Sequence, residues 1–555
     1  MTMKSGALLL VAMGGGIFGA ACSAAPTDAT GTTSQAVSTT LPWAVERPLR
    51  QAEFDAYLVK NASAFESFKN TALGNLGVPM VMLRLFPVLF PQYWGSPSES
   101  FAPVGFAQDP FEPYRVLPLG LGYAGSTPAV TTPAGPVNVN VVTLTCMGCH
   151  GGRVQGPNGQ VLTIPGAPNT QFDGFRTAVY ATVNDPGYTA AAFRAALAAK
   201  PLGWVYGDPT QLVQETLERD IFMAPGGAEA MLAQLQEGSD FFAVRFEETL
   251  GAYTYGLTPN APNPAGPTPG YLDAIGAGIT VVVDPTQLTP AQLQAILPPA
   301  PAMIDIMSVW DQNARPAAQW DGSITDHLHR NLAAEFGVVG SPTNVSMQNA
   351  EVTTTFTAAM PAPAYPYDVD DAAAARGGQL FGQYCASCHH DGNATIFPPS
   401  AVGTDPNRAI IWTPYTVGAL IDVLELACTD PVACDPGGVP LSGAQIVNPT
   451  GGYMALPLSG IWARAPYLHN GSVPTIAALL TRQRPAQFYR GNIVFDTTNV
   501  GFVSSEAVTP YAALFDTTRS GNSNVGHETA EFLGPIDWAN QPDQLHDMLE
   551  YMKTL

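Results

Sequence analysis

Two short motifs in the chain place two cysteines and a histidine at the same spacing. They are Cys146-Met147-Gly148-Cys149-His150 and Cys385-Ala386-Ser387-Cys388-His389. In a C-x-x-C-H motif, the two thiols add to the two vinyl groups of a haem, and the adjacent histidine reaches the iron as an axial ligand. The sequence therefore predicts two covalently bound haem c groups, held by Cys146, Cys149 and His150 and by Cys385, Cys388 and His389.

A C-x-x-C pair is also typical of thiol redox sites and of half zinc sites. Here the C-x-x-C-H motif occurs twice and uses four of the seven cysteines, which favours haem attachment. The two motifs lie far apart in the chain, so each is expected to serve its own domain rather than share one zinc ion.

The composition indicates a large globular protein with long loops. The chain has 555 residues, enough for two or three domains, and 46% of them are apolar. Its 54 glycines and 51 prolines indicate irregular loops that wrap around large groups. The formal net charge of −22 argues against nucleic acid or an anionic membrane surface as a partner. It leaves a small basic redox protein, or a neutral apolar small molecule or polymer, as the expected partner.

The N-terminus is typical of an export signal. Lys4 precedes a short apolar run from Ala7 to Ala21, which predicts a signal peptide over residues 1–22. The run Gly19-Ala20-Ala21-Cys22 resembles a bacterial lipobox and predicts lipidation of Cys22. An ordinary signal peptide, whose cleavage removes Cys22, is the alternative. Residues 23–40 are expected to form a flexible tether. The predicted location is periplasmic or secreted, including an outer-membrane lipoprotein that contacts the membrane only through its lipid.

The remaining cysteines agree with export. Cys428 and Cys434 are close in sequence and are predicted to form a local disulfide bond in an oxidising compartment.

The expected fold is mainly α-helical, with long irregular loops and few short strands, in two c-type cytochrome domains. Residues 41–340 form the predicted N-terminal haem domain, which includes a packing subdomain. Residues 341–370 form a linker, and residues 371–555 form the C-terminal cytochrome c domain. Alternating residues at 137–144 predict a strand that leads into the first motif.

Both ends of the C-terminal domain are predicted to be helices. One begins at Asp370-Asp371 and continues to Tyr384, and the other includes Leu545, Leu549 and Met552. Gly377 and Gly378 resemble the glycines of small c-type cytochromes that let the first helix cross the last at close range.

No motif as specific as C-x-x-C-H identifies the other iron ligands or the residues on the distal side of the first haem. Trp310, Arg315 and Trp320 are candidates for the distal wall of the first haem. Alternatively, the tryptophans are core residues and Arg315 pairs with a carboxylate or a haem propionate. His469 is the candidate sixth ligand of the second haem, with Met454 or another methionine as the alternative. Spacing alone leaves these alternatives open.

The C-terminal third also carries family-like runs. They are Ala465-Pro466-Tyr467-Leu468-His469-Asn470-Gly471-Ser472, Gly521-Asn522-Ser523-Asn524-Val525-Gly526-His527-Glu528 and Leu549 to Leu555. These runs resemble the bacterial di-haem cytochrome c peroxidase relatives, and most closely the branch that includes the rubber oxygenases. The resemblance is specific across 371–555 and weaker across 100–340.

This resemblance implies two haems with unequal roles. The C-terminal haem would be held by His389 and His469 and transfer electrons. The N-terminal haem would have His150 on one face and bind O₂ or peroxide on the other. The implied activity is that of a haem-dependent oxidoreductase, either oxidative cleavage of an apolar alkene, as in rubber oxygenases, or peroxide reduction. A non-enzymatic periplasmic electron-transfer cytochrome is the alternative.

Two departures from the oxygenase pattern bear on the substrate. The chain is shorter, and Val309-Trp310-Asp311 stands where a more aromatic run is expected. Both put a polymer substrate in question more than the haem chemistry. Some relatives hold a structural calcium ion, but no EF-hand spacing occurs here, so calcium binding stays open.

Overall fold

The computed structural model describes residues 46–73, 77–96, 101–124, 129–133, 135–170, 174–246, 271–272, 288–298, 300–339, 346–418 and 447–555. Helices account for 42% of the structure and strands for 13%. The prediction of a mainly helical fold with few short strands is therefore confirmed. Among the described residues, no helix is long and apolar enough to cross a membrane.

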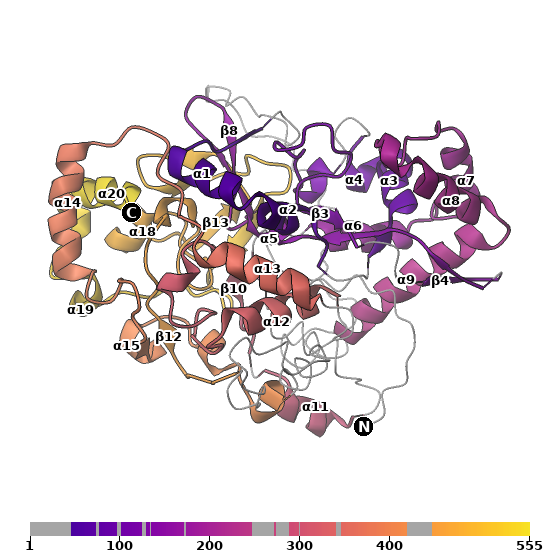
Figure 1. Ribbon diagram of the computed structural model, residues 1–555. Helices are drawn as coiled ribbons and strands as arrows, with labels where there is room; N and C mark the ends of the chain where they lie inside the picture. Colours follow the sequence, from indigo (N-terminus) through magenta and orange to yellow (C-terminus); the bar gives the residue numbers. More distant parts are fainter. Residues whose placement is uncertain are drawn as a thin grey trace, which may run out of the picture.

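One helical layer, at the right in Figure 1, belongs to the N-terminal half of the chain. Its helices are α3 (Met80–Leu89), α4 (Pro91–Trp94), α6 (Gly174–Val183), α7 (Ala190–Ala198), α8 (Leu212–Met223) and α9 (Gly227–Phe246). Their apolar faces enclose a core that includes Phe86, Trp94 and Phe193. Burial of such large aromatic side chains stabilises the layer.

The first motif is attached to this layer by a small antiparallel sheet. Its strands are β2 (Val78–Pro79), β6 (Val141–Leu144) and β3 (Leu121–Tyr123), in that order. The strand predicted at 137–144 is two strands, β6 and the preceding β5 (Gly135–Asn138), which pairs with β4 (Ala129–Thr132). The chain changes sheet at Val139 and Asn140, and the Asn140 carbonyl accepts a hydrogen bond from the Met80 amide at 2.8 Å.

A second core joins the two halves of the chain. It contains Phe68 of α2 (Ala62–Asn70), Trp310, Phe356 of α13 (Met347–Ala358) and Trp462. Part of the segment predicted as a linker, residues 341–370, is therefore a helix buried in this shared core. Its composition resembles a linker, but Phe356 packs against Phe68 with ring centroids 5.3 Å apart.

The C-terminal region, at the left in Figure 1, is closed by two crossing helices, α14 (Asp371–Tyr384) and α20 (Pro542–Lys553). Asp370 caps α14, since its side chain accepts a hydrogen bond from the Ala373 amide at 2.9 Å. A Cβ atom on Gly377 would lie 2.0 Å from the Asp547 carbonyl oxygen. This close approach confirms the predicted helix crossing at a glycine.

Short elements complete the fold. The remaining helices of the described residues are α1 (Ala52–Lys60), α5 (Cys146–His150), α11 (Pro290–Ile296), α12 (His327–Val339), α15 (Pro399–Val402), α18 (Ile476–Thr481) and α19 (Ala530–Leu533). The remaining strands are β1 (Arg47–Pro48), β7 (Gly151–Gln155), β8 (Val161–Pro165), β9 (Tyr271–Leu272), β10 (Ile304–Asp305), β11 (Ile396–Phe397), β12 (Tyr453–Met454), β13 (Gln487–Arg490), β14 (Phe495–Asp496), β15 (Gly501–Phe502) and β16 (Ala513–Asp516).

Candidate functional site

The second motif lies at the end of α14 and opens on a largely apolar cavity. The Cys385 amide donates to the Phe381 carbonyl at 2.8 Å, and the His389 amide donates to the Cys385 carbonyl at 3.0 Å. Neither Cys385 nor Cys388 is part of a disulfide bond. Cys385, Cys388 and His389 all line the cavity. The thiols and the imidazole ring therefore reach one space with apolar walls, as covalent attachment of a haem requires.

The ring of His389 is oriented by the backbone of a distant segment. Its Nδ1 atom lies 2.8 Å from the Leu456 carbonyl oxygen, so it carries the hydrogen and donates it. This bond leaves Nε2 as the free nitrogen, and metal-bound histidines are commonly fixed in this way. Burial lowers the pKa of His389, which keeps the ring neutral and able to bind a metal.

A second histidine faces this ring across the cavity. The ring centroids of His389 and His527 are 6.2 Å apart, and the rings are inclined by only 19°. A bond between a metal and an imidazole nitrogen is about 2 Å long and the ring centre lies about 1 Å further, so two histidines on opposite sides of one metal have centroids roughly 6 Å apart. The pair therefore has the separation expected of two axial ligands of one iron.

The backbone at His527 is unusual in a way that supports a functional role. Its φ angle is 58°, in the left-handed region that non-glycine residues seldom adopt. The His527 amide donates to the Val402 carbonyl at 2.9 Å, which holds this turn in place. Unfavourable backbone conformations of this kind cluster at functional sites.

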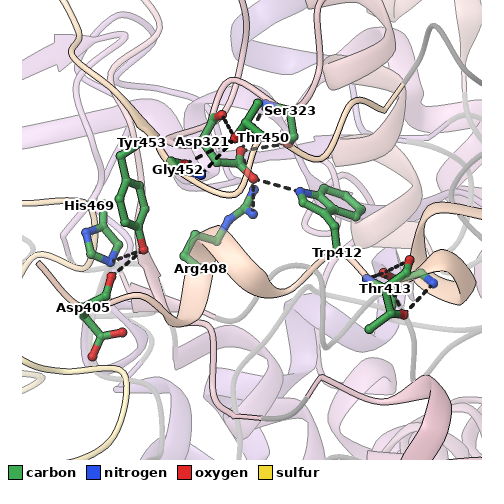
Figure 2. A network of polar contacts seen from close by, with 11 residues as sticks. Asp321, Ser323, Asp405, Arg408, Trp412, Thr413, Thr450, Gly452, Tyr453 and His469 are labelled. Carbon is green, nitrogen blue, oxygen red and sulfur yellow. Dashed lines mark hydrogen bonds and ion pairs between the residues drawn. The ribbon is translucent and has the colours of Figure 1, made fainter. Parts of the chain in front are cut away.

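His469, the residue predicted as the sixth ligand, also lines the cavity but is bound differently (Figure 2). The Tyr453 hydroxyl donates to the Asp405 carbonyl at 2.7 Å. His469 Nε2 lies 3.1 Å from the same hydroxyl and donates to it, and the two rings stack with centroids 4.3 Å apart. Nε2 thus carries a hydrogen, so the arrangement favours His527 over His469 as the ligand. Met454, the alternative, lies in the cavity wall.

The first motif is held more tightly. It forms α5, a five-residue helix between β6 and β7. A turn at residues 165–169 binds it: the Gly166 amide donates to the His150 carbonyl at 2.7 Å, and the Asn169 amide donates to the Cys149 carbonyl at 2.9 Å. From the other side, Thr353 of α13 places its hydroxyl 3.8 Å from the Cys146 sulfur.

Charged side chains surround the first motif. Burial lowers the pKa of His150 to about 3, and the Arg330 guanidinium contributes to this shift. Burial also raises the pKa of both thiols, Cys146 and Cys149, to about 12. In the described part of the chain, no aromatic ring faces His150 as His527 faces His389.

The three predicted distal residues have separate places. Trp310 is fully buried between the two motifs, and its Nε1 donates to the Ser459 carbonyl at 2.8 Å. Trp320 lines the cavity of the second motif and donates to the Asp305 carbonyl at 3.0 Å. Arg315 is buried and contributes to the low pKa of His150. Trp310 also packs near Gly166, in the turn that binds the first motif. Of the three residues expected at the first haem, Trp320 therefore lies at the cavity of the second motif instead.

Two predicted features lie outside the described residues: the lipidation of Cys22 and the disulfide between Cys428 and Cys434. Among the described residues, no cluster of three or more histidine, cysteine, aspartate or glutamate side chains is arranged to hold a metal ion.

Two segments of the chain match families of known proteins, one in the C-terminal region and one that ends at the first motif. Residues 452–490 match a family described as RoxA-like, cytochrome c-like, which agrees with the resemblance to the rubber oxygenase-like branch. This match indicates covalently bound haem c. Residues 63–150, which end at the first motif, match a Y4iN-like domain.

Three proteins of Sinorhizobium fredii are similar to this chain, and all three are described as uncharacterized. The protein y4iM is 38% identical over 284 residues, which is 46% of this chain. The protein y4iJ is 46% identical over 107 residues, and y4iN is 35% identical over 116 residues, each 19% of this chain. The matches cover 66%, 18% and 56% of the three relatives, less than two thirds of each.

Proposed function

We propose that the protein is a di-haem c-type oxidoreductase. The haem attached at Cys385 and Cys388 carries electrons, with His389 and His527 as its axial ligands. The haem attached at Cys146 and Cys149 has His150 as one ligand and binds O₂ or peroxide at the other position. The observation that carries this proposal is the facing pair His389–His527, whose centroids are 6.2 Å apart, combined with a cytochrome c-like match nearby.

The two haems supply redox chemistry at iron, and the chain supplies ligands and surroundings. Burial keeps His150 and His389 neutral, which is the form that binds a metal. Two axial histidines leave no position for a substrate, whereas one histidine leaves a position for a small molecule. The difference between the two motifs therefore supports electron transfer at the second and reaction at the first.

Trp310 offers a route between the two centres. One side of its indole packs on Gly166, whose amide bonds to the His150 carbonyl. Another side packs on Gly460, beside Ser459, which accepts the indole hydrogen bond. A single buried aromatic side chain thus connects segments that carry or support both motifs.

The substrate has two candidates. The RoxA-like match favours O₂ together with an apolar alkene, and the same site would equally serve peroxide reduction with electrons from a small redox protein. The export signal and the haem attachment motifs support a periplasmic or secreted location. A periplasmic electron carrier with no substrate is the competing function, and it requires a second axial ligand on the first iron as well.

Carbon monoxide separates these functions, because it binds ferrous haem only at an open position. We expect the reduced wild-type protein to bind one CO for every two haems. Binding of no CO would overturn the oxidoreductase and leave the electron carrier. Oxygen uptake with an alkene, measured against peroxide-dependent oxidation of a reduced cytochrome, then decides between the two substrates.

A further inference from the structure

Arg315 is buried and Arg464 is half-buried, and neither forms an ion pair in the described part of the chain. Arg315 is only 6% exposed. Arg464 lines the cavity of the second motif, and its Nε atom is buried without a hydrogen-bond partner. Burial lowers the pKa of both, to about 10 for Arg315. Both guanidinium groups have therefore lost most of their water.

Neutral oxygen atoms make up the hydrogen-bond partners of both arginines. Arg315 donates to the Ser308 carbonyl at 2.9 Å and to the Trp310 carbonyl at 3.2 Å. It also donates to the Ser308 hydroxyl at 3.0 Å. Arg464 donates to the carbonyls of Pro457, at 2.8 Å, and Ser459. Among the described residues, neither forms an ion pair.

Other buried arginines in the described part of the chain, such as Arg408 and Arg490, are paired with carboxylates. Arg408 donates to both oxygens of Asp321, at 2.7 and 3.2 Å (Figure 2). Arg490 pairs with Asp305 at 2.5 Å. A desolvated charge without a counter-ion is costly, so an anion from outside the polypeptide would stabilise Arg464 in the cavity wall.

Neighbouring charged groups increase the stabilisation that a bound anion would give to these arginines. Arg315 lies close enough to Arg464 to lower its pKa, and Arg330 acts in the same way on Arg315. Asp311 is the one acidic group that acts on both Arg315 and Arg464 in the described part of the chain, and burial raises its own pKa. Tyr467 is the other titratable group that acts on Arg464. The cluster therefore has excess positive charge.

Arg464 contacts both Trp310 and the cavity of the second motif. Its guanidinium carbon lies 5.7 Å from the centre of the indole ring, and its side chain lines the cavity of Cys385, Cys388 and His389. Arg315 donates to the Trp310 carbonyl. The positive charge of Arg464 is therefore placed at the wall of the second motif's cavity.

We propose that Arg464 binds a propionate carboxylate of the second haem. The proposal depends on the proposed two-haem centre and adds a polar contact that orients the second haem. A guanidinium fork matches a carboxylate in geometry and in charge. The pair would place a carboxylate of the second haem beside Trp310.

The first test is an experimental structure of the haem-loaded wild-type protein. We expect the guanidinium nitrogens of Arg464 within hydrogen-bond distance of a propionate of the second haem. Propionates of that haem that point away from Arg464 would overturn the proposal. A protein with fewer than two haems would contradict the proposed function instead, so the two failures are distinct.

The second test is electrochemical and requires no activity. We expect Arg464→Gln to lower the midpoint potential of the second haem, because a positive charge near the ring favours the reduced state. Arg464→Lys keeps the positive charge but loses the guanidinium fork, so its shift of the midpoint potential should be smaller. The lysine variant replaces the glutamine variant in this test if the latter does not fold. Arg376→Gln is the control, since Arg376 is 58% exposed and pairs with Asp547. Potentials of Arg464→Gln equal to those of the wild type would overturn the proposal.

A free anion is the other source of the same chemistry. Phosphate is added to the wild-type protein at constant ionic strength. If a haem propionate already binds Arg464, the midpoint potentials of both haems should stay unchanged. A potential that depends on phosphate concentration would show that a small anion binds there, and the assignment to haem propionates would fail.

Discussion

The two C-x-x-C-H motifs have the same residue spacing but are held in different ways. The second follows the 14-residue helix α14, leaves Ser387 exposed and directs His389 toward His527. The first forms a five-residue helix between strands, within bonding distance of a tight turn. The motif itself therefore specifies attachment only. What faces each histidine comes from segments far away in the chain, and those segments decide whether the iron has an open position.

The largest expected effect is the loss of one haem. Cys385→Ser with Cys388→Ser should remove the mass of one haem from the mature protein, because no thiol remains at that site. The remaining haem should still bind CO when reduced. Mass spectrometry and CO difference spectra check both statements.

The matched variant is Cys146→Ser with Cys149→Ser, which should lose the other haem and all CO binding. If both double variants bind CO equally well, the two centres do not have the unequal roles proposed here.

The next effect is a change of spin state. His527→Ala should convert the second haem from low spin to high spin, since one axial ligand is lost. His469→Ala should leave the spin state unchanged, because its Nε2 donates to Tyr453 rather than to a metal. Absorption and electron paramagnetic resonance spectra of the oxidised proteins measure the outcome. A change of spin in the His469 variant alone would restore the ligand predicted from the sequence.

These two histidines show what the sequence could and could not specify. The motifs, the helices at both ends of the C-terminal region and their crossing at Gly377 could be predicted, because each depends on local spacing or a local packing rule. His527 was part of a family-like run but had no assigned role. Its position depends on a left-handed backbone turn, φ 58°, and on a bond to Val402 far away in sequence. No local pattern encodes such a long-range contact.

Trp320 was misplaced for a similar reason. Its closeness in sequence to Trp310 and Arg315 suggested one shared wall, but the chain turns between them. Gln319 and Gly322 both have positive φ angles, 70° and 63°. The turn directs Trp320 toward the second cavity, so neighbours in sequence serve different centres.

A smaller effect is expected at the helix crossing that supports the second motif. Gly377→Ala should destabilise the protein by about 1–3 kcal/mol, the usual cost of overpacking, because its Cβ would lie 2.0 Å from the Asp547 carbonyl. Gly382→Ala is the matched control on the same helix, with nothing within 4 Å of the added atom. It should stabilise the helix by roughly 0.5–1 kcal/mol. Thermal unfolding of both variants checks the contrast, and equal stabilities would mean that the helices do not cross at Gly377.

The smallest effect concerns a buried acid beside the first motif. Burial raises the pKa of Glu335 to about 7 from 4.5. Its carboxyl group accepts hydrogen bonds from the Ser346 amide, at 2.8 Å, and from Asn349, at 2.9 Å. Between pH 4.5 and 7 the folded state therefore holds a proton that the unfolded state releases. This contribution to stability is complete below pH 4.5 and is lost as the pH rises through 7, by at most about 3 kcal/mol.

Glu335→Gln should remove that dependence, because an amide does not titrate and its single oxygen can keep the hydrogen bond from the Ser346 amide. The variant and the wild type should be about equally stable at pH 4.5, and the variant should be the more stable above pH 7. Denaturant unfolding across this range measures the difference, with Glu351→Gln on α13 as a control for the loss of an exposed carboxylate. Parallel pH profiles for wild type and Glu335→Gln would mean that Glu335 is ionised in the folded protein. The excess positive charge around the first motif would then be smaller than its arginines indicate.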